Sequence, residues 1–260
     1  MPYLARDGVK LFYEESGSGD PPLLLVHGWT CNHTHWAAQV AHFAPRHRVV
    51  TVDLRGHGQS DAPQQEYTME GFADDLAWLC GELGIDRPVV VGHSMGGIVT
   101  LVMTARHPAV VRAAVLVDSP FPPVGGTSSA ARLTPVIEAM SQPDYMAYAT
   151  SFVETMFSPL DDPQRKRESV AGLLATPQHV LVSSMRSNAA TDTMAAAESI
   201  EQPLLVISAG HMAFNDTSLL KTRFPRFRFG QTVGSGHFNM VEVPEQVNAM
   251  LERFLATDVE

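Results

Sequence analysis

Residues 89–100 read VVVGHSMGGIVT and place a single serine, Ser94, among small residues between two apolar runs. The run before Gly92 is typical of a buried strand, and the run from Ile98 is typical of a helix. Residues 92–96 match the pattern G-x-S-x-G, a sharp strand-to-helix turn that exposes a serine hydroxyl. The stretch therefore predicts a strand–turn–helix unit with Ser94 on the turn.

Short apolar runs recur on both sides of this unit. Buried strands of a parallel sheet read as such continuous runs, and these lie at 22–26, 49–52, 113–117 and 204–207. Segments with helical periodicity alternate with them at 33–43, 68–83 and 98–106. Alternation of strands and helices predicts an α/β fold with a mostly parallel, doubly wound sheet.

The pattern changes after Asp118. Residues 120–199 contain no strand pattern, open with several prolines and glycines, and continue with helix-compatible segments rich in Met, Ala and Ser. The strand pattern resumes at Pro203. We interpret 1–119 and 200–260 as the two parts of one core and 120–199 as a helical cap inserted between them.

The composition favours a globular protein and argues against several classes of partner. The 260 residues carry a net charge of −10 and no basic cluster, which argues against nucleic acid as a partner. The two cysteines lack metal-ligand spacing, and we expect neither a metal nor another cofactor. No apolar run reaches the roughly 18 residues of a membrane span, and no signal peptide is visible, so we expect a cytoplasmic protein. No pattern indicates an oligomeric state.

Three further segments occur in a fixed order around the serine turn. His27-Gly28-Trp29 follows a predicted strand, Asp53 opens the segment DLRGHGQS, and Gly236-His237-Phe238 lies near the C-terminus. Together with the serine turn, these segments resemble the α/β-hydrolase superfamily over nearly the whole chain. The resemblance implies an eight-stranded, mostly parallel sheet with the helical cap inserted after the sixth strand.

The resemblance also implies roles for individual residues. Ser94 corresponds to the nucleophile, and His237, in a glycine-rich turn before the last helix, corresponds to its general base. A serine hydroxyl needs such a base within hydrogen-bond reach and an acid that orients the base. The backbone N–H groups of Trp29 and Met95 correspond to an oxyanion hole.

The acid has two candidates. In most of the family it follows the strand predicted near 204–208, but here Ala213 stands at the expected position and Asp216 comes three residues later. A subset of the family, including zearalenone-lactone hydrolases and cofactor-free ring-cleaving dioxygenases, carries the acid one strand after the nucleophile. Asp118 occupies that place, and adjacent parallel strands present their carboxyl ends to one crevice. We favour Asp118 and keep Asp216 as the alternative.

These residues predict a serine hydrolase that cleaves a carboxylic ester or lactone through a Ser-His-Asp triad and an acyl-enzyme. An apolar substrate is expected because the cap is rich in methionine and contains Phe152 and Phe157. Two alternatives remain open. One is a cofactor-free dioxygenase or a carbon–carbon bond hydrolase on the same scaffold, and the other is a receptor-like ligand-binding member with little turnover.

Overall fold

The computed structural model describes residues 2–123, 130–164, 166–167, 170, 175–211 and 215–259. Its centre is an eight-stranded sheet with the order β1-β2-β4-β3-β5-β6-β7-β8. The strands are β1 (Tyr3–Arg6), β2 (Val9–Ser16), β3 (Leu23–Val26), β4 (Val49–Val52), β5 (Val89–His93), β6 (Ala113–Val117), β7 (Leu204–Ser208) and β8 (Arg228–Gln231). The β1–β2 and β2–β4 pairs are antiparallel and all the other pairs are parallel, so the predicted fold class is confirmed.

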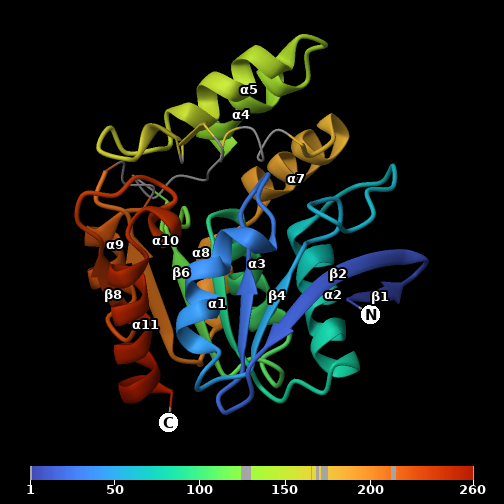
Figure 1. Ribbon diagram of the computed structural model, residues 1–260. Helices are drawn as coiled ribbons and strands as arrows, with labels where there is room; N and C mark the ends of the chain where they lie inside the picture. The colour runs from blue at the N-terminus through green and yellow to red at the C-terminus, as the bar shows by residue number, and fades with distance from the viewer. Residues whose placement is uncertain are drawn as a thin grey trace.

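Helices cover both faces of this sheet (Figure 1). One face carries α1 (Ala37–Phe43) and α11 (Pro244–Asp258), and the other carries α2 (Met69–Glu82), α3 (Met95–Arg106) and α8 (Thr193–Ser199). Alternate residues of β3 enter opposite core clusters, with Leu24 and Val26 on the α3 side and Leu23 and Leu25 on the α1 side. Because both faces of the strand are buried, its sequence is apolar throughout rather than alternating.

Besides α8, the described residues between β6 and β7 form helices that lie above the carboxyl ends of the parallel strands (Figure 1). They are α4 (Ala130–Met140), α5 (Tyr145–Glu154) and α7 (Gln178–Ala190). The Gln178 amide donates to the Met140 carbonyl at 2.9 Å and joins α7 to α4. Of the cap predicted over 120–199, residues 124–129, 165, 168–169 and 171–174 lie outside the described residues. The division into core and cap stays a prediction.

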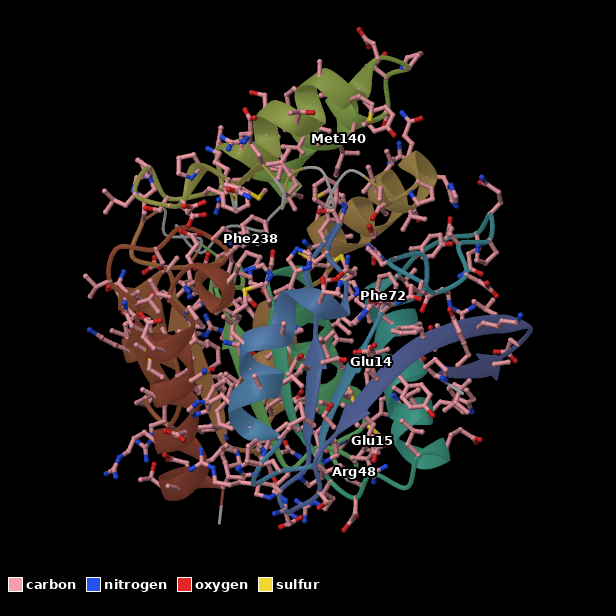
Figure 2. The ribbon with its side chains drawn as sticks, in the orientation of Figure 1. Glu14, Glu15, Arg48, Phe72, Met140 and Phe238 are labelled. Atoms are coloured by element: carbon pink, nitrogen blue, oxygen red, sulfur yellow. The ribbon has the colours of Figure 1, made fainter. Side chains whose placement is uncertain are left out.

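Charged side chains interact at the end of the sheet opposite to α4, α5 and α7. The Arg48 guanidinium donates to the Glu15 carboxylate and to the carbonyls of Leu83 and Gly84. Figure 2 shows Arg48 and Glu15 at one end of the molecule and Met140 of α4 at the other. Arg48 therefore links β2, through Glu15, to the end of α2, through the two carbonyls, far from the helices above the sheet.

Several expected boundaries were wrong. The helix predicted over 33–43 begins as a 3₁₀ turn, His33–Trp36, capped by the Asn32 side chain, and becomes α-helical only at Ala37. The helix expected from Ile98 begins at Met95, directly after the serine. The last strand, which the apolar runs did not indicate, is β8 and ends at Gln231; Val233 beyond it is exposed. The half-exposed edge strand β1 has no apolar run and was not predicted.

The remaining helices among the described residues are the 3₁₀ turn η1 (His33–Trp36), α9 (Thr217–Arg223) and α10 (Asn239–Glu242). Both cysteines, Cys31 and Cys80, are buried and unpaired. Among the described residues, no helix combines the length and the apolar character needed to cross a membrane.

Candidate active site

Ser94 lies on a strained turn between β5 and α3. Its backbone has φ 53° and ψ −119°, a conformation that residues with a side chain rarely adopt. The turn is tight: a Cβ on Gly96 would lie 2.3 Å from the carbonyl oxygen of His27, and one on Gly92 would lie 2.2 Å from the carbonyl oxygen of Gly96. Both glycines are therefore required by close backbone approach, and the turn holds the serine side chain above the sheet edge.

His237 connects Ser94 to Asp118. The Ser94 Oγ lies 2.9 Å from His237 Nε2, and His237 Nδ1 lies 2.6 Å from an Asp118 carboxylate oxygen. Asp118 is fully buried and His237 is 4% exposed. Because a carboxylate only accepts, His237 Nδ1–H donates to Asp118, and Nε2 is left to accept the Ser94 hydroxyl proton.

Both carboxylate oxygens of Asp118 accept hydrogen bonds. The second carboxylate oxygen accepts the N–H of Ala209 at 2.8 Å, and the N–H of Asp118 donates to the Ile207 carbonyl at 2.7 Å. The residue follows β6 directly and has a positive φ of 42°. β6 lies between β5 and β7, so the carboxylate is fixed beside the serine turn and under the histidine.

Asp216 has a different role. It caps the N-terminus of α9, where its carboxylate accepts the N–H of Leu219 at 2.9 Å. Helix N-caps favour aspartate in this arrangement. Ala213, which stands where the family acid was expected, lies outside the described residues. Of the two candidate acids, the structure brings only Asp118 to His237.

Two side chains that sequence reasoning did not assign hold the histidine loop. His93, which precedes the serine, donates from Nε2 to the His237 carbonyl at 2.8 Å. Glu242 accepts the N–H of Gly236 at 2.8 Å, next to the histidine. Burial lowers the pKa of His93 well below its ordinary value and raises the pKa of Glu242. His93 is therefore neutral, which suits a single ring donor facing a carbonyl.

The His27-Gly28-Trp29 segment lies against the serine turn. A Cβ on Gly28 would lie 3.1 Å from the Ser94 Cβ, and the Trp29 indole donates to the Leu181 carbonyl of α7 at 3.0 Å. Within the part of the chain that the structure describes, the backbone N–H groups of Trp29 and Met95 donate no hydrogen bond. Met95 begins α3, whose N-terminus carries a partial positive charge.

A cavity of about 70 Å³ opens beside these groups and includes both Ser94 and His237. Most of its other walls are apolar: Trp29, Pro120, Leu133, Phe152, Met156 and Met185. Among the described residues, Arg132 and Asn188 complete its lining. Such a cavity admits a small organic group and keeps most water away from it.

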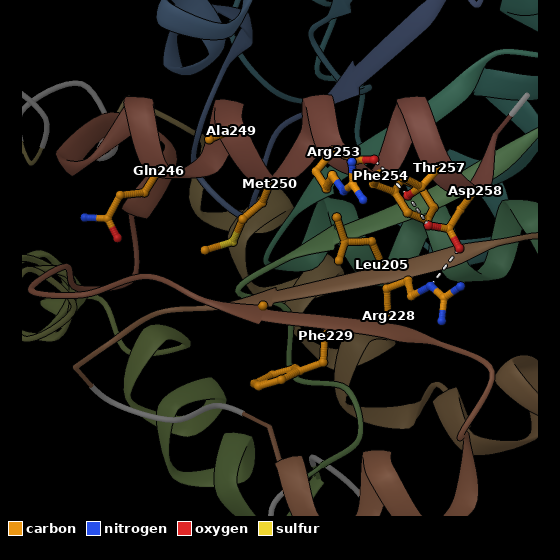
Figure 3. Close-up of a pocket in the computed structure, with 11 residues that line it drawn as sticks. Leu205, Arg228, Phe229, Gln246, Ala249, Met250, Arg253, Phe254, Thr257 and Asp258 are labelled. Atoms are coloured by element: carbon orange, nitrogen blue, oxygen red, sulfur yellow. Dashed lines mark hydrogen bonds and ion pairs between the residues drawn. The ribbon is translucent and has the colours of Figure 1, made fainter.

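A larger groove of about 730 Å³ lies elsewhere, between α11 and the strands β7 and β8 (Figure 3). Its lining includes Arg228, whose guanidinium donates to the Asp258 carboxylate at 2.6 Å, and the apolar side chains of Met250 and Phe254. It contains none of the predicted site residues. Among the described residues, no cluster of His, Cys, Asp and Glu could hold a metal ion.

Residues 21–244 match the family model of the alpha/beta hydrolase fold. The chain belongs to this family. The match covers strands β3 to β8 and the segment between β6 and β7, and it ends at the first residue of α11.

Relatives of this family member have several activities. A bifunctional esterase/perhydrolase of Acinetobacter calcoaceticus is 37% identical over 121 residues, which is 46% of this chain and 44% of that protein. Bifunctional epoxide hydrolase 2 of Sus scrofa is 33% identical over 148 residues, 56% of this chain and 26% of that protein. The crystal structure of the enol-lactonase of Burkholderia xenovorans LB400 superposes with a TM-score of 0.85 at 25% identity, over 98% of this chain and 100% of that one. The first curated relatives are matched over only about a third of their own length.

Proposed function

We propose that this chain is a serine hydrolase that cleaves a carboxylic ester or lactone of an apolar small molecule. The observation that carries the proposal is the hydrogen-bonded row Ser94–His237–Asp118 at the wall of a mostly apolar cavity. The esterase/perhydrolase and the enol-lactonase, which resemble this chain, act on the same bond class by their names.

The acylation step follows from the geometry. Ser94 Oγ attacks the substrate carbonyl carbon while His237 Nε2 takes the hydroxyl proton. Asp118 holds the Nδ1–H of His237 and stabilises the imidazolium that forms. The N–H groups of Trp29 and Met95 donate to the oxyanion, and each such donor contributes about 3–4 kcal/mol in enzymes where one has been removed.

Release of the products reverses these roles. The tetrahedral intermediate collapses, its C–O bond to the alcohol breaks, and His237 gives the proton to the departing oxygen. A water molecule then loses a proton to His237 and attacks the acyl-enzyme. The acid leaves, and Ser94 regains its hydroxyl proton. A lactone would give a hydroxy acid by the same sequence.

Epoxide opening, the activity named for one relative, fits this site poorly. Attack of a serine oxygen on an epoxide carbon leaves an ether, which has no carbonyl for water to attack. An ester formed from Ser94 has such a carbonyl and can be hydrolysed at the same site. The nucleophile at residue 94 therefore favours acyl chemistry.

The test is hydrolysis of p-nitrophenyl esters, from acetate to octanoate, by the wild type and Ser94→Ala. We expect turnover by the wild type, a loss of at least about a thousandfold in the variant, and a preference for acyl chains of four carbons or fewer. The chain-length preference follows from the cavity of about 70 Å³.

Covalent labelling locates the nucleophile. A fluorophosphonate should add one phosphonyl group, and peptide mass spectrometry should map it to the peptide that contains Ser94 rather than to other serines of the chain. Absence of both turnover and labelling would contradict the proposal. Oxygen uptake with hydroxylated aromatic compounds would then favour the dioxygenase alternative, which shares the position of Asp118.

A further inference from the structure

The cavity beside Ser94 has one buried polar group that the reaction does not use. Asn188 of α7 lines this cavity and is 8% exposed. Its side-chain oxygen is buried and accepts no hydrogen bond from the described residues. Of the described side chains with such an unpartnered buried atom, Asn188 is the one that lines the cavity of Ser94 and His237.

The position of Asn188 is fixed by its helix. Leu181, Met185 and Asn188 follow one another at helical spacings of four and three and therefore share one face of α7. Leu181 accepts the Trp29 indole N–H at 3.0 Å, and Met185 lines the cavity. This face of α7 is thus the one turned toward the catalytic residues.

The helix is also tied to the core. The hydroxyls of Ser183 and Ser187 accept the N–H groups of Tyr67 and Met69 at 2.8 and 2.9 Å. Met69 is the first residue of α2, so these two bonds anchor α7 to the layer beneath it. Asn188 is consequently presented to the cavity by an anchored element rather than by a surface loop.

A buried acceptor without a donor is unfavourable, because the amide has lost its hydrogen bonds to water. Folded proteins keep few such groups, and the exceptions call for a reason. A leucine at this position would fill a similar volume without that cost. The retained amide is explained if a ligand supplies the missing donor, which requires the atoms that now cover the oxygen to move when the ligand enters the cavity.

We propose that Asn188 is a specificity-determining residue that accepts a hydrogen bond from an O–H or N–H of the substrate. The proposal rests on the proposed function and narrows its substrate class. The preferred ester or lactone carries a hydroxyl or amide donor near the scissile carbonyl, because the cavity of about 70 Å³ holds only a short group. A site that hydrogen-bonds a substrate hydroxyl discriminates strongly against the analogue that lacks it.

The experiment compares esters that differ only by a hydroxyl in place of a methyl group. The probes are p-nitrophenyl 3-hydroxybutanoate against 3-methylbutanoate, and 2-hydroxybutanoate against 2-methylbutanoate. For each pair, kcat/KM of the hydroxylated ester is divided by that of its methyl partner, for the wild type and for Asn188→Leu. Comparing the two proteins cancels the intrinsic reactivity of the esters. We expect the ratio of at least one pair to fall about tenfold or more in Asn188→Leu.

Two controls separate recognition from folding. Met185→Leu changes a neighbouring wall residue between apolar side chains and should leave the ratios unchanged. Asn188→Leu should keep or raise the melting temperature, since it removes no hydrogen bond of the folded chain. Ratios unchanged in Asn188→Leu, or a clear drop in its melting temperature with equal losses on both members of each pair, would overturn the proposal.

Binding measured without turnover separates this proposal from the proposed function. In the Ser94→Ala protein, calorimetric titration gives the dissociation constants of the same ester pairs with and without Asn188→Leu. If no protein hydrolyses any ester but the hydroxylated member binds more tightly only when Asn188 is present, the hydrolase function fails and the role of Asn188 stands. If turnover is normal and neither assay depends on Asn188, the hydrolase function stands and the proposed role of Asn188 fails. Absence of both binding and turnover overturns both proposals.

Discussion

At the scale of single residues, the candidate site depends on which carboxylate accepts the hydrogen bond from the His237 ring. Asp118 receives the His237 ring N–H with one oxygen and the Ala209 backbone N–H with the other. The carboxylate therefore holds the ring in the tautomer that leaves Nε2 free to accept from Ser94. The Asp216 carboxylate instead accepts a backbone hydrogen bond at the start of α9.

This difference predicts opposite results for two matched substitutions. Asp118→Asn should lower kcat for ester hydrolysis by about a thousandfold or more, because an amide beside His237 favours the wrong tautomer. Asp216→Asn should leave kcat within about twofold, since asparagine caps helices as well as aspartate does. Steady-state kinetics of both variants on one p-nitrophenyl ester measures the contrast. Equal losses in the two variants would remove Asp118 from the proposed triad.

At the scale of elements, the strand–turn–helix unit of β5 and α3 determines where the nucleophile lies. The first turn of α3 packs against the end of β3, where Gly96 approaches the carbonyls of Val26 and His27. These contacts are between backbones, so side-chain rearrangement cannot relieve a larger residue. Gly81 in α2 is the converse case, because a Cβ there would meet nothing within 4 Å.

We expect these two glycines to respond differently to alanine. Gly96→Ala should lower the free energy of unfolding by about 1–3 kcal/mol and reduce ester hydrolysis, because the turn has to shift. Gly81→Ala should leave stability unchanged or raise it by up to about 1 kcal/mol, since alanine is the better helix former. Urea unfolding of both variants beside the wild type gives the values. A fully stable and active Gly96→Ala variant would contradict the packing described for the turn.

At the scale of the whole molecule, burial keeps several histidines neutral. His27 accepts the N–H of Leu54 at 2.9 Å, and the ring of His57 packs against that of His27 in the loops above the sheet. Burial lowers the pKa of His27 to about 3 and that of His57 to about 3. In the unfolded chain both would titrate near the ordinary value of about 6.5. Below that pH, the unfolded chain therefore binds more protons than the folded one.

The contribution of these two histidines to stability decreases as the pH falls. Stability from these two groups is fully present above about pH 6.5 and is lost as the pH falls toward about 3. Each histidine should lower the free energy of unfolding by about 1.6 kcal/mol between pH 6.5 and 5. Glu242, with its raised pKa, acts in the opposite direction as a single group.

Urea unfolding at pH 8, 6.5 and 5 measures this effect. His57→Phe should flatten the decline between pH 6.5 and 5 by about one histidine's share, because phenylalanine keeps the ring contacts and does not titrate. An unfolding free energy that stays constant from pH 8 to pH 5 would contradict the neutral burial of these rings.

Local patterns in the sequence determined the elements and the identity of two site residues. Apolar runs predicted the buried strands because both faces of β3 to β7 are covered, and the turn around Ser94 was readable because its glycines meet backbone atoms. The edge strand β1 was not predicted, because its residues are only partly buried and its sequence shows no apolar run. The order of motifs along the chain pointed to His237 without any knowledge of distance.

Only the tertiary structure decided which groups meet. His237 is 143 residues from Ser94 and 119 from Asp118, so their contacts depend on the order of strands in the sheet. The choice between Asp118 and Asp216 had the same origin, since both follow strands whose carboxyl ends face one edge. No local pattern in the sequence indicates the hydrogen bonds of His93 and Glu242 to the histidine loop or the unpartnered side-chain oxygen of Asn188. The hydrogen-bond partner of a polar side chain is a property of the packed chain, because a sequence period indicates which elements are buried but not which elements meet.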